Sequence, residues 1–216
     1  MQNFVYLVGD PVARECVVVD PAWEIDRIVA TAEADGMRLV GALVTHTHQD
    51  HVGGSLESWG MPGRIPGVEE LLERAPMKVY VHRAEREFLK GYGSDLVKVD
   101  AGDTLQVGVL TVTFVHTPGH TPGSQCFLVD GCLISGDTLF IRSCGRTDLP
   151  GSDPAEMYTS LTQRLGALPD ETVVLPGHNY GGSQTTIGDE KRGNPMMRFR
   201  SMSEFLTAMG GGRSRG

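Results

Sequence analysis

Thr-His-Thr-His-Gln-Asp-His, at residues 45–51, carries the strongest signal in this chain for both architecture and chemistry. From His46 to His51 it places three imidazoles and one carboxylate within six positions. Neutral imidazole binds zinc and iron well, and a carboxylate adds a hard, negatively charged oxygen. The stretch therefore predicts part of a site for a divalent transition metal, which residues elsewhere in the chain must complete.

The strand that leads into this stretch is one of four segments with the same pattern. Each is an apolar run that ends in a turn and then in a metal-type side chain. The four are Leu39–Thr45 before His46, Leu110–Thr117 before His120, Cys132–Ser135 before Asp137, and Thr172–Leu175 before His178. A sheet whose strand ends line up would bring these side chains together. A His-rich surface loop, the simpler interpretation, would need no such partners.

Three further segments have clear local signals. Phe4–Val8 and Glu15–Asp20, separated by Gly9-Asp10-Pro11, predict an opening hairpin. Apolar residues recur at helical spacing from Ile25 until Gly36, and Asp153 followed by Pro154 predicts the start of another helix. Residues 55–76, rich in Gly and Pro, are expected to form an insertion over the site.

Composition and charge exclude several classes of protein. With 216 residues, 40% of them hydrophobic, the chain can bury a full core, so we expect one domain over residues 1–209 and a disordered tail over 210–216. A formal net charge of -8 argues against nonspecific nucleic-acid binding. The chain lacks a long apolar run and a basic N-terminal segment, so we expect no membrane span and no secretory signal. A cytosolic protein with reduced cysteines is the resulting prediction.

Seven metal-type side chains occur in an order that resembles the metallo-β-lactamase superfamily, over about residues 4–200. They are His46, His48, Asp50, His51, His120, Asp137 and His178. The resemblance implies an α/β fold, an αββα sandwich of two mixed sheets with helices on the outer faces and metals at one edge. It also implies the grouping of the ligands. One metal would be held by His46, His48 and His120, a second by Asp50, His51 and His178, with Asp137 bridging.

Within this family the chain looks like glyoxalase II, which hydrolyses S-acylglutathione thioesters. Two divalent ions about 3.5 to 4 Å apart lower the pKa of a shared water toward neutrality. A thiolate leaves readily, because a free thiol has a pKa of about 8.5. The main prediction is therefore a thioester hydrolase with two divalent ions, zinc being expected, and a bridging hydroxide as nucleophile. Asp50 would hold a metal and orient the attacking water.

A second branch, the persulfide dioxygenases, is an alternative. The segment Ile-Arg-Ser-Cys-Gly-Arg-Thr-Asp at residues 141–148 resembles the signature of these enzymes, which oxidise glutathione persulfide. The resemblance implies one ferrous ion held by His46, His120 and Asp137, with open positions for oxygen and persulfide. Residues 149–151 and 176–179 depart from that branch, and its Pro-rich C-terminal tail is missing. For glyoxalase II, the roughly forty residues after His178 are too few for the helical substrate-binding domain of that family.

Substrate contacts are less well specified by the sequence. Both branches imply a small thiol-linked, glutathione-like substrate, no nucleic-acid or membrane partner is expected, and a homodimer is left open. Arg142 and Arg146 carry guanidinium groups that could fork onto a substrate carboxylate, although Arg146 could equally pair with Asp148. Tyr180 is predicted either to reach the pocket or to pack. A metal-stabilised binding module, a third class of function, would need an incomplete ligand set.

Other histidines and cysteines outside these ligands are interpreted as structural. His82 ends a predicted strand, and His116 lies on a strand four residues before His120. Cys144 is interpreted as inert packing, since a buried thiol is usually unreactive.

Overall fold

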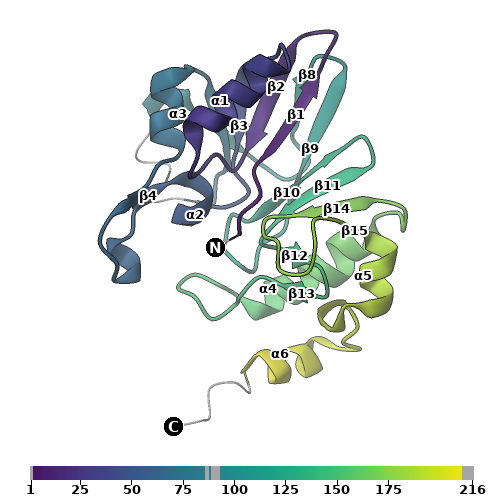
Figure 1. Cartoon of the computed structure of the whole chain (residues 1–216). Helices are drawn as coiled ribbons and strands as arrows, with labels where there is room; N and C mark the ends of the chain where they lie inside the picture. The colour runs from purple at the N-terminus through teal and green to yellow at the C-terminus, as the bar shows by residue number, and fades with distance from the viewer. Residues whose placement is uncertain (1, 86–87, 89–92, 211–216) are drawn as a thin grey trace.

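Two mixed β-sheets packed face to face form the centre of the computed structural model, which describes residues 2–85, 88 and 93–210 (Figure 1). In spatial order, the first sheet contains β1 (Tyr6–Asp10), β2 (Glu15–Val19), β3 (Arg38–Leu43), β6 (Lys78–His82) and β7 (Leu96–Val99). The second contains β15 (Thr185–Thr186), β14 (Val173–Pro176), β11 (Cys132–Gly136), β10 (Gln125–Val129), β9 (Leu110–His116) and β8 (Thr104–Val107).

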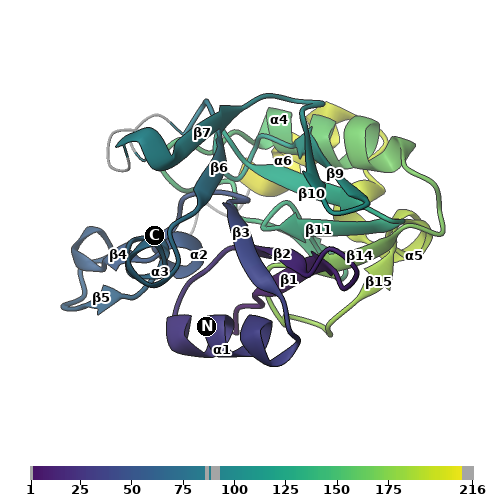
Figure 2. The same cartoon turned by 90° about the horizontal axis from the view of Figure 1, so that it is seen from above.

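Helices cover the outer face of each sheet. On the first sheet these are α1 (Ile25–Ala34) and α3 (Val68–Arg74), and on the second they are α4 (Pro154–Thr159), α5 (Ile187–Gly193) and α6 (Met202–Gly210). Figure 2 shows the layers from above, with α1 on one side, α4 and α6 on the other, and the strands between. The predicted αββα sandwich is confirmed.

The apolar strands are buried on both faces, which explains their continuous runs of hydrophobic residues. Successive side chains of a strand point to opposite faces. Val17 and Val19 of β2 therefore pack between the sheets, against Phe114 and other residues of the second sheet, while Cys16 and Val18 pack toward α1 and α3. A third core lies between the second sheet and its helices. Each large side chain buried in this way contributes about 1.5 to 3 kcal/mol.

Short elements connect the main strands and helices along the chain. They are α2 (Gln49–Val52), β4 (Gly54–Ser55), β5 (Arg64–Ile65), β12 (Leu139–Phe140), β13 (Ser143–Cys144), the 3-10 helices η1 (Glu57–Trp59), η3 (Gly93–Asp95), η5 (Leu165–Ala167) and η6 (Pro195–Met197), and the π-helix η4 (Ser160–Arg164). Of the predicted insertion, α3 packs on the first sheet with Val68 and Leu71 buried. Its other part forms the β4–β5 hairpin around η1.

One of the predicted element boundaries differs from the structure, and a second agrees with it. The opening hairpin forms as predicted, but Gly9 and Asp10 belong to β1, and the turn follows them because the Asp10 carboxylate accepts the Val12 amide. The helix begun by Asp153 has the predicted cap, whose side chain accepts the amides of Ala155 and Glu156.

The structure also bears on the predictions for the cysteines, the C-terminal tail and membrane spans. The four cysteines have free thiols. Gly210, the first residue of the predicted tail, ends α6, and residues 211–216 lie outside the described part. Among the described residues, no helix has both the length and the apolar character needed to cross a bilayer.

Candidate metal centre

Strand direction brings the predicted ligands to one edge of the sandwich. In the first sheet β2, β3 and β6 are parallel, so the segments that follow them start at the same edge. In the second sheet β9 and β11 are both antiparallel to β10, and β14 is parallel to β11. The segments after β3, β9, β11 and β14 carry all seven predicted metal ligands, with Asp50 and His51 on α2.

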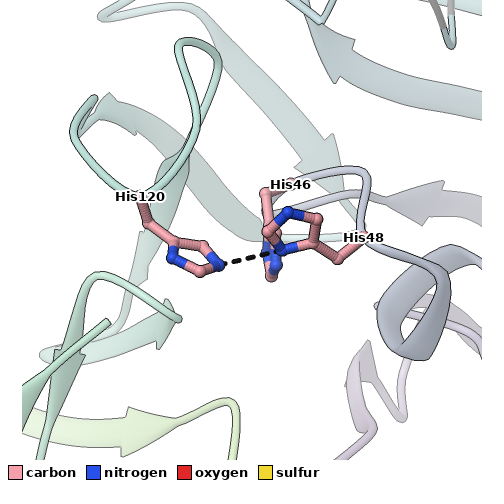
Figure 3. Close-up of side chains that lie close together, drawn as sticks. All are labelled: His46, His48 and His120. Carbon is pink, nitrogen blue, oxygen red and sulfur yellow. Dashed lines mark hydrogen bonds between the residues drawn. The ribbon is translucent and has the colours of Figure 1, made fainter. Parts of the chain in front are cut away.

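The first cluster is the three-histidine group, which consists of His46, His48 and His120. Their nitrogen ligand atoms lie within 4.8 Å of one another. Figure 3 shows the three rings converging, with His48 Nδ1 2.9 Å from His120 Nε2. His46 Nε2 is buried and has no hydrogen-bond partner in the part of the chain that the structure describes. A buried imidazole nitrogen of this kind fits a metal ligand, because a metal would supply its missing partner.

Hydrogen bonds on the far side of the rings turn the ligand nitrogens inward. His120 Nδ1 donates to the backbone carbonyl of Arg146 at 2.8 Å, which leaves Nε2 unprotonated toward the centre. Thr45 Oγ1 donates to the Asp20 carboxylate at 2.6 Å and therefore accepts from His46 Nδ1 at 3.1 Å. These bonds fix the tautomer that a metal ligand needs.

The second cluster is the Asp50 group, which consists of Asp50, His51 and His178, also with ligand atoms within 4.8 Å. His51 Nε2 and His178 Nε2 are 3.2 Å apart, and they lie 3.6 and 3.5 Å from Asp50 Oδ2. The Asp20 carboxylate accepts His51 Nδ1 at 2.9 Å, so the other ring nitrogen faces the cluster.

Two residues earlier in the chain, Asn3 and Trp23, donate hydrogen bonds to Asp50. Asn3 Nδ2 donates to Asp50 Oδ2 and to its backbone carbonyl, both at 3.0 Å, and Trp23 Nε1 donates to the same carbonyl at 3.1 Å. Trp23 has a φ of 74°, a left-handed conformation that non-glycine residues seldom adopt. The backbone of the ligand loop is therefore fixed by residues remote in sequence.

Asp137 lies between the two groups. Its Oδ1 is 3.3 Å from both His51 Nε2 and His178 Nε2, and its Oδ2 is 3.6 Å from His120 Nε2. A Cβ at Gly177 would come within 2.8 Å of Asp137 Oδ1, so the close approach of these two loops requires a glycine at this position. The carboxylate can thus serve either group or bridge them.

The electrostatics differ between the two groups. Burial lowers the pKa of His46 well below its usual value and that of His48 to about 4, so both rings are neutral and ready to bind a metal. Burial also opposes protonation of His51, but the Asp137 and Asp20 carboxylates outweigh it and raise the His51 pKa. Burial disfavours the Asp137 charge, yet His51 and His178 hold the pKa of this carboxyl well below its usual range.

A cavity of about 500 Å³ opens onto both groups. Its apolar walls come from Trp59, Phe140, Leu149 and Tyr180. The Tyr180 ring stacks on His178, with ring centroids 4.7 Å apart and planes within 6°. Cys144 also lines the cavity, and burial raises the pKa of its thiol to about 12, so the thiol stays neutral at physiological pH.

The two candidate substrate arginines are placed differently. Arg146 lines the cavity, and its guanidinium forks onto the Asp148 carboxylate with distances of 2.9 and 3.0 Å. Arg142 turns away toward α5, where its Nη1 donates to the backbone carbonyl of Asp189 at 2.7 Å. The structure therefore brings Arg146 and Tyr180, but not Arg142, to the metal centre.

Residues outside the predicted ligand set fall into two classes. His82 and His116 stack on each other with ring centroids 3.8 Å apart, and His116 Nε2 bonds to the carbonyl of Pro122. Their structural interpretation agrees with this packing. Asp20 was not predicted, although it ends an apolar strand in the same way as the ligands do. Asn3 and Trp23 gave no signal in the sequence.

Comparisons with known proteins place this site in context. The sequence model described as the metallo-beta-lactamase superfamily matches residues 1–178. The human mitochondrial persulfide dioxygenase ETHE1 is 32% identical over 212 residues, covering 96% of this chain and 76% of that protein. A probable polyketide biosynthesis zinc-dependent hydrolase of Bacillus subtilis, PksB, is 30% identical over 181 residues, covering 84% of this chain and 75% of that protein.

Solved structures resemble the whole chain as well. The crystal structure of ETHE1 from Myxococcus xanthus superposes with a TM-score of 0.82 and is 32% identical, covering 99% of this chain and 88% of that one. The likeness thus extends beyond the ligand loops to all layers of the sandwich.

Proposed function

Because the chain belongs to the metallo-beta-lactamase superfamily and its site assembles the ligand residues of a metalloenzyme, we propose that it is a persulfide dioxygenase that uses one ferrous ion. The substrate proposed is a small thiol persulfide such as glutathione persulfide. The observation that carries the proposal is the likeness to ETHE1 proteins over nearly the whole chain. The sequence match to the human persulfide dioxygenase ETHE1 covers 96% of the chain, and the structural match to ETHE1 from Myxococcus xanthus covers 99% of it. This choice reverses the order of the two reactions that the sequence alone suggested.

The geometry supports the proposal through one subset of the ligands. His46, His120 and Asp137 offer two histidines and one carboxylate. His46 has a ligand atom within 4.8 Å of one on His120 and of one on Asp137, and His120 Nε2 lies 3.6 Å from Asp137 Oδ2. When bound there, ferrous iron would supply open coordination positions for oxygen and for the persulfide sulfur. The Arg146 carbonyl keeps His120 in the required tautomer, and the Thr45 hydroxyl does the same for His46.

The cavity walls support a sulfur substrate. Phe140, Leu149 and Trp59 line the cavity beside the centre, and the neutral Cys144 thiol adds no charge there. Arg146 at the cavity can receive a substrate carboxylate if that group competes with Asp148 for the guanidinium fork. The pocket thus combines apolar walls with the guanidinium of Arg146 beside the ligand groups.

A thioester hydrolase with two divalent ions is the second candidate. The observation that favours it is the Asp50 group, which offers three further ligand atoms within 4.8 Å of one another. The likeness to a zinc-dependent hydrolase, at 30% identity, adds support. In this reaction Asp50 would hold the second metal and orient water.

One experiment separates the two reactions. Protein purified without added metal is analysed for its elements and then assayed for oxygen uptake with glutathione persulfide and for cleavage of S-lactoylglutathione. The proposal predicts about one equivalent of iron per chain and oxygen uptake that depends on the persulfide. About two equivalents of zinc with thioester cleavage and no oxygen uptake would instead establish the hydrolase.

A further inference from the structure

A buried carboxylate behind the three-histidine group has no part in the site described above. Glu85 follows β6, the strand next to β3 in the first sheet, and only 7% of its surface is exposed. Because β3 and β6 are parallel, the segments after both strands start from the same edge, which is the edge that carries the metal ligands.

The Glu85 side chain receives hydrogen bonds from both loops that carry the three-histidine group. Thr47, which lies between His46 and His48, donates its hydroxyl to Oε2. Thr121, next to His120, donates its hydroxyl to Oε1, and the Gly123 amide donates to the same oxygen at 3.0 Å. One carboxylate therefore connects residues that are 74 positions apart in the chain, Thr47 and Thr121.

The fit around Glu85 is close. A Cβ at Gly123 would lie 2.5 Å from Glu85 Cγ, so the second loop can approach the carboxylate only with a glycine here. Burying a carboxylate is costly unless hydrogen bonds replace its water, and three donors do so at this position. Removing the carboxylate would leave two threonine hydroxyls and one amide without their acceptor.

We propose that Glu85 is a positioning residue that sets the distance between the His46–His48 loop and the His120 loop, and so tunes the metal affinity of the three-histidine group. It acts through Thr47 and Thr121, and it does not face the cavity. The inference rests on the proposed metal centre, but it does not depend on which of the two reactions the centre performs.

A purely structural role is the competing explanation, and the chain contains a matched control for it. Glu190 in α5 is also a buried carboxylate, and it accepts one backbone amide, that of Arg142, and one threonine hydroxyl, that of Thr185. None of the metal ligands is adjacent to these donors in sequence. Glu85→Ala and Glu190→Ala should both lower the melting temperature, whereas only the first should change metal binding.

The test measures metal binding by metal-free protein. Zinc affinity is determined by competition with a chromophoric chelator, and the absorption spectrum of the cobalt(II)-loaded protein reports ligand geometry. Loss of a partner bonded directly to a metal ligand typically weakens binding about 10- to 100-fold, and Glu85 acts one residue further from the ligands, so the lower end, about tenfold, applies here. We expect a loss of this size and an altered cobalt spectrum for Glu85→Ala, and wild-type affinity and spectrum for Glu190→Ala.

Partial rescue adds a second criterion. Glu85→Gln keeps one acceptor oxygen and the shape of the side chain, so it should recover part of the lost affinity. If Glu85→Ala does not fold, Thr47→Val and Thr121→Val remove the two donors singly with little change of volume. Each should weaken zinc binding, and in the Glu85→Gln background only the threonine that still donates to the remaining oxygen should keep its effect.

The outcomes are distinguishable. Wild-type zinc affinity and an unchanged cobalt spectrum in Glu85→Ala, or in both threonine variants, would overturn the inference while leaving the metal centre intact. An equal loss of affinity in Glu190→Ala would assign the effect to general destabilisation and would also overturn it. A wild-type protein that binds no metal would overturn the metal centre and the inference together.

Discussion

The two halves of the metal centre are built from similar side chains but in different electrostatic surroundings. In the three-histidine group burial dominates, and the low pKa values of His46 and His48 keep these rings neutral. In the Asp50 group carboxylates dominate, and those of Asp137 and Asp20 raise the pKa of His51. The first group suits a metal ligated mainly by imidazole, and the second supplies negative charge for a further cation.

The two groups are used differently by the two candidate reactions. The proposed oxygenase needs only His46, His120 and Asp137, whereas the hydrolase needs both groups filled. Substitutions in the shared ligands should stop either reaction, and substitutions confined to the Asp50 group should separate them.

Removing a ligand used by both reactions should have the largest consequence. His120→Ala and Asp137→Ala should each lower persulfide-dependent oxygen uptake, or thioester cleavage, by more than about a hundredfold, because even indirect partners of metal ligands cost 10- to 100-fold. Steady-state rates and bound metal per chain measure the effect. His116→Ala is the control, since this ring stacks on His82 and bonds to the Pro122 carbonyl. Full activity in either ligand variant would contradict the site.

Removing His178, a ligand of the Asp50 group, should distinguish the two candidate reactions. His178→Ala should lower thioester cleavage by more than about a hundredfold if the centre is dinuclear, because it removes a ligand of the second metal. Oxygen uptake by a one-iron enzyme should fall by only about tenfold, since His178 would then be no ligand and would act on the iron ligands through the Asp137 carboxylate, at 3.3 Å. The ratio of the two losses is the measurement. Equal losses in both assays would mean that the halves do not act separately.

An intermediate effect on metal binding is expected when a residue that hydrogen-bonds to the Asp50 group, but is not a ligand, is replaced. Asn3→Ala removes the donor to Asp50 Oδ2 and to its carbonyl, so binding of a second metal should weaken about tenfold. Zinc titration of the metal-free protein should show this loss in the second equivalent and not in the first. Gln2→Ala is the neighbouring control, because its carbonyl, which accepts the Asn179 amide, is unchanged. A loss confined to the first equivalent would reverse the assignment of the halves.

The sequence predicts the metal ligands better than the residues that hold them, because the ligands follow local patterns and their supports do not. The ligands were found because each follows an apolar strand, and parallel strand ends must meet at one edge. Asp20 ends such a strand too and could have been found by the same rule. Asn3 reaches Asp50 across 47 residues of chain, a contact that depends on how the N-terminal segment closes over the loop. No local pattern encodes that closure.

The orientation of Arg142, whose guanidinium points to α5 and not into the cavity, has a local cause. Arg142 is the second residue of the turn between β12 and β13, and its φ of 61° is left-handed. Hairpin turns of this kind are normally signalled by Asn or Gly, and Ile141-Arg142 gives no such signal. The turn directs the Arg142 amide to Glu190 and the guanidinium to Asp189, away from the cavity.

The smallest expected effect concerns the ring that covers the Asp50 group. Tyr180 stacks on His178 but is 59% exposed, so the stacking contributes toward the lower end of about 0.5 to 1.5 kcal/mol. Tyr180→Ala should therefore weaken binding of the second metal about two- to fivefold, with the first unaffected. Tyr180→Phe keeps the ring and should bind both equivalents as the wild type does. If the phenylalanine variant lost as much affinity as the alanine variant, the hydroxyl rather than the stacked ring would be the part of Tyr180 that supports His178.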